Sequence, residues 1–310
     1  MRQLRTRFLP AIVLLSLALA ACTSNGSGAS PGATGAEKPG ITIGSKDFTE
    51  SVVLAYLYGQ VLEDNGYPVE YKLRVGATEL IDPALTSGEI DMYPEYTGTT
   101  LVNLMGEEAS NDAEDVYQRV AAFYADRGQT ALDMTPANDS DGLAVTQATA
   151  DEYDLHTISD LAAVSDELIL GGPPECAERE TCLLGLQDVY GANFKSFEPI
   201  AQGGLKYQAL LDGDVDVVVV FTTDGAIAAN DLVVLEDDKG LYPAYNIIPV
   251  VRNDYLESAP DDFADLINSV SEKITTDEIA GLNAQVDLEL REPEDVADEW
   301  LHDQELIAPD

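Results

Sequence analysis

The chain has 310 residues, of which 57 are Asp or Glu and only 16 are Lys or Arg, so its formal net charge is −41. This charge argues against nucleic acid as a partner, because phosphate repulsion would dominate. It also argues against adhesion of the folded body to anionic lipid. A strongly acidic surface serves solubility, and it equally fits adaptation to high salt, where screening makes such a surface tolerable.

The N-terminus is typical of a targeting segment. Arg2, Arg5 and Arg7 precede an apolar run over 9–21 that is too short for a comfortable transmembrane helix. The run ends at Ala21 and Cys22, a junction that resembles the lipobox of bacterial lipoproteins. We therefore expect a signal peptide over 1–21 and a lipidated Cys22, which anchors the protein to the outside of the cell membrane. The alternative is an ordinary secretory signal that ends near a cysteine.

A flexible tether is expected over 22–40, because the segment after Cys22 is rich in Gly, Ser, Ala and Pro and has too little apolar surface to form a core. The folded part then starts near Ile41 and has about 270 residues, enough for two lobes of ordinary domain size. No later apolar stretch is long enough to span a membrane, so any channel or motor is expected to be a separate chain.

Strands and helices alternate through the folded part. Apolar patterns predict strands over 41–44, 69–75, 143–145, 168–170 and 247–251, and helices over 52–61, 80–85, 112–127, 159–161, 183–190 and 207–211, with a mostly helical end over 261–307. Asp47 with Glu50 fits a variant of the capping box, and Ser159 is the expected cap of its helix. The alternation indicates an α/β class with largely parallel sheets.

Two stretches, 84–97 and 209–222, echo each other at an offset of 125 residues (221 − 96). Each has a helix end, a glycine, a buried strand and an aromatic residue where the strand meets its loop. The aligned pairs are Gly88 with Gly213, Asp91 with Asp216, Tyr96 with Phe221, and Thr97 with Thr222. Ligands of open α/β sheets bind beyond the carboxyl ends of strands, so we expect two similar lobes, each offering one ring to a cleft. Helix–glycine–strand units also look alike in unrelated α/β proteins.

Motifs of enzymatic chemistry are missing from the sequence. It contains no Walker A pattern, no dinucleotide-binding glycine pattern and no nucleophile elbow. We therefore expect a protein that is not an enzyme and has neither cofactor nor metal site. Cys176 and Cys182, in a polar loop outside the cytosol, are expected to form a disulfide, with two free thiols as the alternative.

Several dispersed motifs resemble one family. They are Ile43-Gly44-Ser45-Lys46-Asp47-Phe48-Thr49-Glu50, Gly88 to Thr99, Phe221 to Ile227, Leu235 to Lys239, and Tyr242-Pro243-Ala244-Tyr245. Together they resemble the substrate-binding lipoproteins of osmoprotectant ABC importers, the glycine betaine/carnitine/choline-binding family. The resemblance covers residues 41–303.

The resemblance implies a bilobal fold of the periplasmic-binding-protein type (type II). Two α/β lobes are joined by a two-stranded hinge and close over the ligand. The first lobe is expected to comprise 41–137 and 246–310, and the second 138–245. The expected partners are a small zwitterionic or cationic ligand and the permease and ATPase subunits of the importer, with the binding protein itself a monomer.

The resemblance also implies an aromatic box around a quaternary ammonium. Such a group cannot donate N–H hydrogen bonds, so ring faces hold it by cation–π attraction and by burial of its methyl groups. Tyr96, Phe221 and Tyr245 match box positions. Packing of these rings at strand ends, without ligand contact, is the structural alternative.

One box position departs from the pattern, because Asp141 aligns with a family tyrosine. Its carboxylate could face a cation directly, accept hydrogen bonds from a ligand with N–H groups, or cap backbone amides in a hinge loop. Lys46, Arg179 and Thr99 match family donors to a ligand carboxylate, although both cations could instead be surface groups. Their presence favours a carboxylate ligand over choline.

The sequence thus predicts an extracytoplasmic solute-binding lipoprotein that delivers glycine betaine or a related trimethylammonium compound to a permease. Choline, carnitine, proline betaine and a betaine of histidine type are the alternative ligands. A sensor or adhesion lipoprotein with the same fold is the alternative function.

Overall fold

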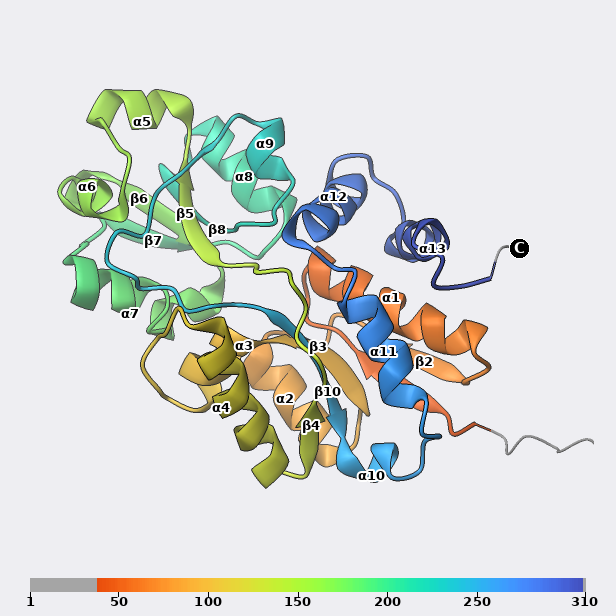
Figure 1. Ribbon diagram of the computed structural model, residues 1–310. Coiled ribbons are helices and arrows are strands. Elements are labelled where there is room, and N and C mark those ends of the chain that lie inside the picture. The colour runs from red at the N-terminus through yellow and green to blue at the C-terminus, as the bar shows by residue number, and fades with distance from the viewer. Residues whose placement is uncertain (1–37, 309–310) are drawn as a thin grey trace, which may run out of the picture. The chain divides into compact units, whose positions relative to one another are not determined.

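The computed structural model describes residues 38–308. The predicted signal peptide, Cys22 and nearly all of the tether lie outside the described residues. The described residues form two five-stranded sheets, each covered by helices (Figure 1). No helix in this part of the chain combines the length and apolar character needed to cross a membrane.

The first sheet has the strand order β2-β1-β3-β10-β4. Its strands are β1 (Ile41–Gly44), β2 (Val69–Lys72), β3 (Met92–Tyr96), β4 (Gln129–Ala131) and β10 (Ile247–Arg252). The helices of this lobe are α1 (Thr49–Asp64), α2 (Thr78–Ser87), α3 (Thr97–Thr99) with its π-helical extension Thr100–Leu104, α4 (Ala113–Asp126), α10 (Asn253–Leu256), α11 (Phe263–Ser271), α12 (Thr276–Asp287) and α13 (Pro293–Asp303). The last three helices pack on α1, so the end of the chain completes the lobe that its beginning starts.

The second sheet has the order β7-β6-β8-β5-β9. Its strands are β5 (Asp141–Val145), β6 (Ile169–Gly172), β7 (Ser196–Pro199), β8 (Val217–Phe221) and β9 (Val233–Val234). Its α-helices are α5 (Gln147–Tyr153), α6 (Ile158–Ala162), α7 (Leu183–Gly185) with its π-helical extension Leu186–Tyr190, α8 (Gly204–Asp212) and α9 (Ala226–Ala229). Single 3₁₀ turns at Ser165–Glu167 and Pro174–Glu178 flank β6.

Both sheets are mixed rather than parallel throughout, because one strand of each runs against its neighbours. In the first sheet this strand is β10, and in the second it is β5. Each reversed strand is entered from the segment that crosses between the lobes, and the crossings meet in an antiparallel bridge between Asn138 and Asn246. Figure 1 shows them side by side between the sheets.

The two echoed stretches occupy equivalent places in the two sheets. Gly88 and Gly213 end α2 and α8 in the left-handed conformation, with φ of 77° and 79°, which glycine adopts without a Cβ clash. Asp91 accepts a hydrogen bond from Thr42 N at 2.8 Å, and Asp216 accepts one from Ile169 N at the same distance. The strands that follow, β3 and β8, both lie third in their sheets, so Tyr96 and Phe221 end equivalent strands.

Two expected helix caps are wrong. Phe48, not Asp47, precedes α1, and no side chain caps that helix. Glu50 does not reach back to the cap because its carboxylate is buried among Tyr96, Thr223 and Asn283. In α6 the cap is Thr157, which forms a capping box with Asp160 in place of the expected Ser159.

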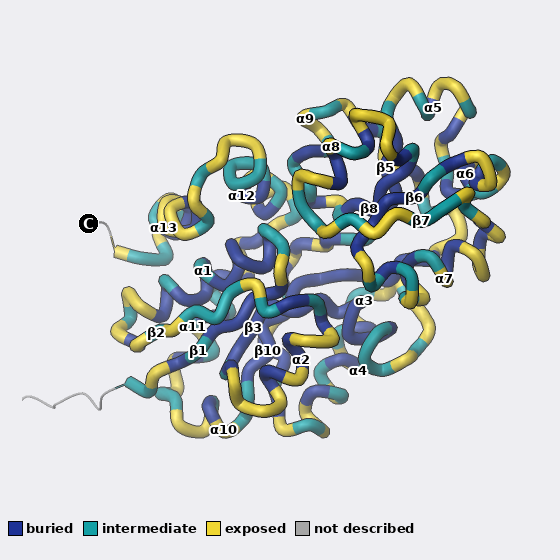
Figure 2. The backbone as a smooth tube through the Cα atoms, turned by 180° about the vertical axis from the view of Figure 1, so that it is seen from behind, coloured by how far each residue is buried: buried dark blue, intermediate teal, exposed yellow. Residues whose placement is uncertain are grey.

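The buried core follows the central strands of each sheet. β3 is buried along its whole length, as are the first four residues of β8, whereas the outer helices carry exposed faces (Figure 2). This distribution places the carboxyl ends of β3 and β8, with their aromatic residues, on a rigid base.

Candidate ligand-binding site

A pocket lies between the two lobes, where β3, β8 and the crossing segments end. Every ligand contact predicted from the sequence lines it: Lys46, Tyr96, Thr99, Asp141, Arg179, Phe221 and Tyr245. It is further lined by Asp47, Phe48, Ala77, Thr78, Asp139, Pro173, Glu175, Cys176, Thr181, Cys182, Gln202 and Val219. Residues from both sheets therefore form one concave site, as is usual for small-molecule sites between α/β units.

Four aromatic rings line this pocket, one more than the sequence indicated. The additional ring belongs to Phe48, whose centroid lies 6.0 Å from that of Tyr96 and 5.1 Å from that of Phe221. Phe48 therefore links the ring of the first lobe to the ring of the second. The sequence did not indicate Phe48 as a pocket residue. It lies in a loop just before α1, where no periodic pattern distinguishes an aromatic side chain that packs in the core from one that contacts a ligand.

The tyrosine hydroxyls of the pocket are held by carboxylates. Tyr96 donates to Glu50 Oε1 at 2.9 Å, and Tyr245 donates to Asp141 Oδ2 at 2.6 Å. Burial, together with these neighbouring carboxylates, raises the pKa of both phenols well above the ordinary value. The rings are therefore neutral and fixed in orientation, which preserves their negative faces for a cation.

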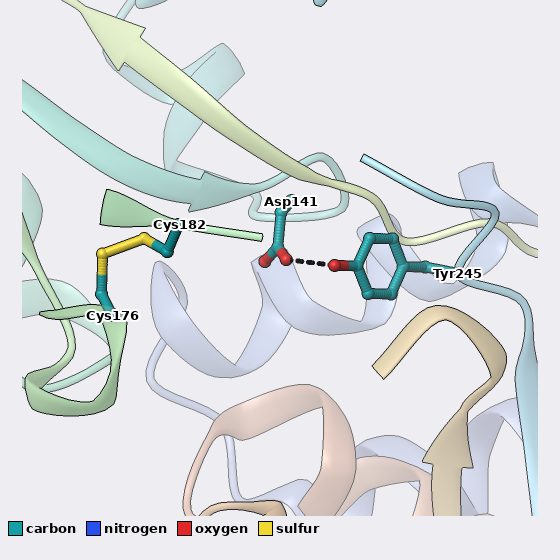
Figure 3. The surroundings of a disulfide bond; sticks show 4 residues. All are labelled: Asp141, Cys176, Cys182 and Tyr245. Carbon is teal, nitrogen blue, oxygen red and sulfur yellow. Dashed lines mark hydrogen bonds between the residues drawn. A yellow bond between two sulfur atoms is a disulfide. The ribbon is translucent and has the colours of Figure 1, made fainter. Parts of the chain in front are cut away.

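Asp141 begins β5 and is paired in the sheet register with Phe221. Figure 3 shows its carboxylate between the disulfide of Cys176 and Cys182 and the hydroxyl of Tyr245. Burial raises the pKa of Asp141, while the hydrogen bond from Tyr245 and the nearby Arg179 act to lower it. Among the described residues, Oδ2 has a side-chain hydrogen-bond partner and Oδ1 has none, so Asp141 keeps an acceptor for a further partner.

Lys46 lines the pocket, but its ammonium is already paired. It forms a buried ion pair with Glu95, and its Nζ lies 4.8 Å from the centroid of the Tyr96 ring. Glu95 also accepts from Tyr93 Oη at 3.0 Å and from Tyr96 N at 2.7 Å. The positive charge of Lys46 is therefore largely balanced within the first lobe.

Arg179 is also paired, but across the cleft. Its Nη2 lies 3.1 Å from each carboxylate oxygen of Glu79, in α2 of the first lobe. Desolvation acts to raise the pKa of the Glu79 carboxyl, but the Arg179 guanidinium, the backbone N–H of Glu79 and the charge of Lys46 together outweigh it, so the pKa falls below the ordinary value. Arg179 Nε is buried and has no hydrogen-bond partner among the described residues. That N–H is therefore an unsatisfied buried donor beside the pocket.

The loop that carries Arg179 is closed by a disulfide between Cys176 and Cys182. Both half-cystines line the pocket together with Thr181. The cross-link reduces the conformations available to a short loop, and it thereby holds Arg179 near the cleft.

Carboxylates outnumber cations around the pocket. Asp47, Asp139, Asp141 and Glu175 line it against Lys46 and Arg179, and the two cations have Glu95 and Glu79 as partners. Among residues 38–308, no group of three or more His, Cys, Asp and Glu side chains could hold a metal ion. The site thus combines ring faces with excess negative charge, an environment that suits an organic cation.

Two α/β lobes with a ring-lined pocket between them define a bilobal solute-binding protein. Residues 39–303 match the family described as the substrate binding domain of ABC-type glycine betaine transport system. The chain therefore belongs to this family and is an extracytoplasmic substrate-binding component of an ABC transporter.

Individual relatives agree with this assignment. The chain is 34% identical over 275 residues to the carnitine transport binding protein OpuCC of Listeria monocytogenes, covering 87% of this chain and 89% of that protein. It is 33% identical over 278 residues to a glycine-betaine-binding protein of Pseudomonas aeruginosa, covering 86% and 88%. A crystal structure of a glycine betaine/carnitine/choline ABC transporter aligns with a TM-score of 0.70 at 30% identity, covering 86% of this chain and 99% of that chain.

Proposed function

We propose that this protein captures glycine betaine or a related quaternary-ammonium zwitterion between its lobes and delivers it to the permease. The observation that carries the proposal is the set of four rings, from Phe48, Tyr96, Phe221 and Tyr245, around one pocket. A trimethylammonium group has no N–H to donate, so ring faces and methyl burial are the interactions that hold it. The relatives from Listeria monocytogenes and Pseudomonas aeruginosa are named for carnitine and for glycine betaine, two ligands of this kind.

The carboxylate of the zwitterion would bind to the hydrogen-bond donors of the pocket. Arg179 Nε is a buried donor with no partner within residues 38–308, and Thr99 offers a hydroxyl. Lys46 adds positive potential, although Glu95 balances much of it. In this arrangement the carboxylate of Asp141, hydrogen-bonded to the ring-bearing Tyr245, would balance the charge of the ammonium group.

Choline is the second candidate ligand, and one observation favours it. Both pocket cations are already paired with carboxylates, while Asp141 retains a free oxygen. Choline carries the same trimethylammonium group with a hydroxyl in place of the carboxylate, so it needs no cationic partner and its hydroxyl can donate to a carboxylate.

A thermal-shift panel tests both candidates. Glycine betaine, carnitine, proline betaine, choline, histidine betaine and ordinary amino acids are added to the mature domain, and a ligand that binds only the folded state raises the melting temperature. Glycine betaine should give a larger shift than glycine at equal concentration. Equal shifts, or none for any quaternary ammonium compound, would contradict the proposal.

The organisation of the chain is proposed as follows. Residues 1–21 are removed as a signal peptide, Cys22 carries the lipid, and the segment to residue 40 tethers a monomeric binding domain to the membrane. The first lobe comprises 41–137 and 246–310, and the second 138–245. Mass spectrometry of the protein from membranes, which would find a lipid-modified Cys22 at the N-terminus, tests the anchor.

A further inference from the structure

A second buried cluster lies beside the ring-lined pocket, and none of its side chains was singled out as a ligand contact from the sequence. At its centre is Glu50, in the first turn of α1, with 3% exposure. Its Oε1 accepts from the hydroxyl of Tyr96, and its Oε2 lies 2.6 Å from Thr223 Oγ1 and 2.8 Å from Asn283 Nδ2. One carboxylate thus contacts a pocket ring, the second lobe and helix α12.

These contacts connect the two lobes. Glu50 belongs to α1, which packs on the first sheet, and Asn283 belongs to α12, which packs on α1. Thr223, in contrast, follows β8 of the second sheet. Asn283 Nδ2 also donates to the backbone carbonyl of Thr223 at 3.3 Å. Lobes that separate would break the contacts to Thr223 and keep the bond between Tyr96 and Glu50.

The hydroxyl of Thr223 lies between two carboxyl groups. Its Oγ1 is 2.6 Å from Glu50 Oε2 and 2.8 Å from Asp139 Oδ1, and all three residues are buried. A hydroxyl has one proton to donate, so it can serve only one of two ionised carboxylates. The other carboxyl must supply its own proton to make the second bond. The observed geometry therefore accommodates one proton shared by Glu50 and Asp139.

We propose that Glu50 is a positioning residue that couples the Tyr96 ring to lobe closure, and that closure traps one proton between Glu50 and Asp139. This inference rests on the proposed function, because the contacts of the cluster to Thr223 form only when the lobes close, as they do over a ligand. The Tyr96 ring stays bound to Glu50 in either state, and the bond to Thr223 then ties that ring to the second lobe.

The charges around the cluster reinforce the need for a proton. Asp224 and Asp141 lie near it on the second lobe, Asp287 lies on α12, and Lys206 pairs with Asp224 at 2.9 Å. The ion pair of Lys46 with Glu95 also lies beside Tyr96, with Lys46 Nζ 4.8 Å from the centroid of its ring. Burial raises the pKa of Glu50, and burial together with the charge of Glu50 raises the pKa of Asp139 well above the ordinary value.

The sign of the pH effect follows from this difference between states. With the lobes apart, both carboxyl groups meet water and titrate near their ordinary pKa values of about 4. With the lobes together, one of them keeps its proton to a higher pH. The affinity for the ligand is therefore highest below the ordinary pKa of the carboxyl groups. It falls as the pH rises from that value through the raised pKa of the closed state. One trapped proton limits the slope to about tenfold in affinity per pH unit.

Calorimetry of glycine betaine and of choline, each in two buffers of different ionisation enthalpy, measures protons taken up on binding. The wild-type protein should take up between zero and one proton per ligand within the transition. Glu50→Gln should take up none, and its affinity should stay nearly constant across the range where the wild-type affinity falls. Glu63→Gln removes the same charge from a surface position of the same helix and should behave like the wild type.

Two further measurements keep the test decisive. Asp139→Asn removes the other carboxyl group of the pair and should also abolish proton uptake. This variant replaces Glu50→Gln in the test if Glu50→Gln fails to fold. Glu50→Ala should bind at least several-fold more weakly than Glu50→Gln at low pH, because it no longer holds the Tyr96 ring. Wild-type proton uptake of zero, or uptake unchanged in both carboxamide variants, would overturn the proposal.

Failure of the proposed function is distinguishable from failure of this inference. If no quaternary ammonium compound raises the melting temperature, the function fails, and small-angle scattering of the ligand-free protein then tests the cluster alone. The radius of gyration of the wild type should grow with rising pH while that of Glu50→Gln does not. Equal behaviour of the two proteins would refute the trapped proton.

Discussion

Replacement of Phe48 by leucine is the sharpest test of the ring-lined pocket. Leucine keeps an apolar side chain at the start of α1 but removes the π face that lies between the rings of Tyr96 and Phe221. A ring in a desolvated cation site contributes about 1–2 kcal/mol. Since 1.4 kcal/mol is a factor of ten, the affinity for glycine betaine should fall about 5- to 30-fold.

A neutral isostere separates the electrostatic part of this effect from burial. tert-Butylacetate has the shape and carboxylate of glycine betaine but carries a tert-butyl group in place of the trimethylammonium. Competition calorimetry of both compounds on wild type and Phe48→Leu measures the ratio of their affinities. The affinity for glycine betaine divided by the affinity for tert-butylacetate should fall in the variant, because cation–π attraction acts only on the ligand with the positively charged group.

A matched control uses a phenylalanine away from the pocket. Phe123 lies on α4, where its ring packs against Tyr124 and the Arg127 guanidinium. Phe123→Leu should leave both affinities unchanged. If Phe48→Leu weakened both ligands equally, the ring would act by burial only. Unchanged affinity for glycine betaine would remove Phe48 from the site.

Three further substitutions test other parts of the site. Tyr96→Ala should weaken glycine betaine binding about tenfold or more in calorimetry through loss of one ring, whereas Tyr93→Phe, on the same strand but outside the pocket, should not. Asp141→Asn should weaken choline binding about tenfold or more, because a hydrogen bond to an ionised group contributes about 1.5–3 kcal/mol; an unchanged calorimetric affinity would give this residue a loop role only. Cys176→Ser should lower the free energy of unfolding by about 2 kcal/mol, the loop-closure value for a disulfide of sequence separation 6, and denaturant titration of the wild type with reductant should match the variant.

The sequence by itself determined the class, the location of the cleft and part of its lining. The two echoed stretches could be read because each depends on local requirements: a glycine at positive φ, an aspartate that binds the neighbouring strand, and a run of buried residues. Six residues that match family positions, and Asp141 where the pattern departs, all line one pocket. Such signals survive in the sequence because they are set by residue type and short spacing.

The tertiary structure alone decided how the charges are paired. Lys46 and Glu95 are 49 residues apart in the sequence, and Arg179 and Glu79 are 100 apart, so no spacing rule indicated that each cation has a carboxylate partner. Glu50 looked like a helix cap, because Glu in a first helical turn is common there. Its real neighbours are brought in by the other lobe and by α12. The ion-pair partner of a buried charged side chain depends on which distant segments pack around it and exclude water. Only the folded chain brings those segments together.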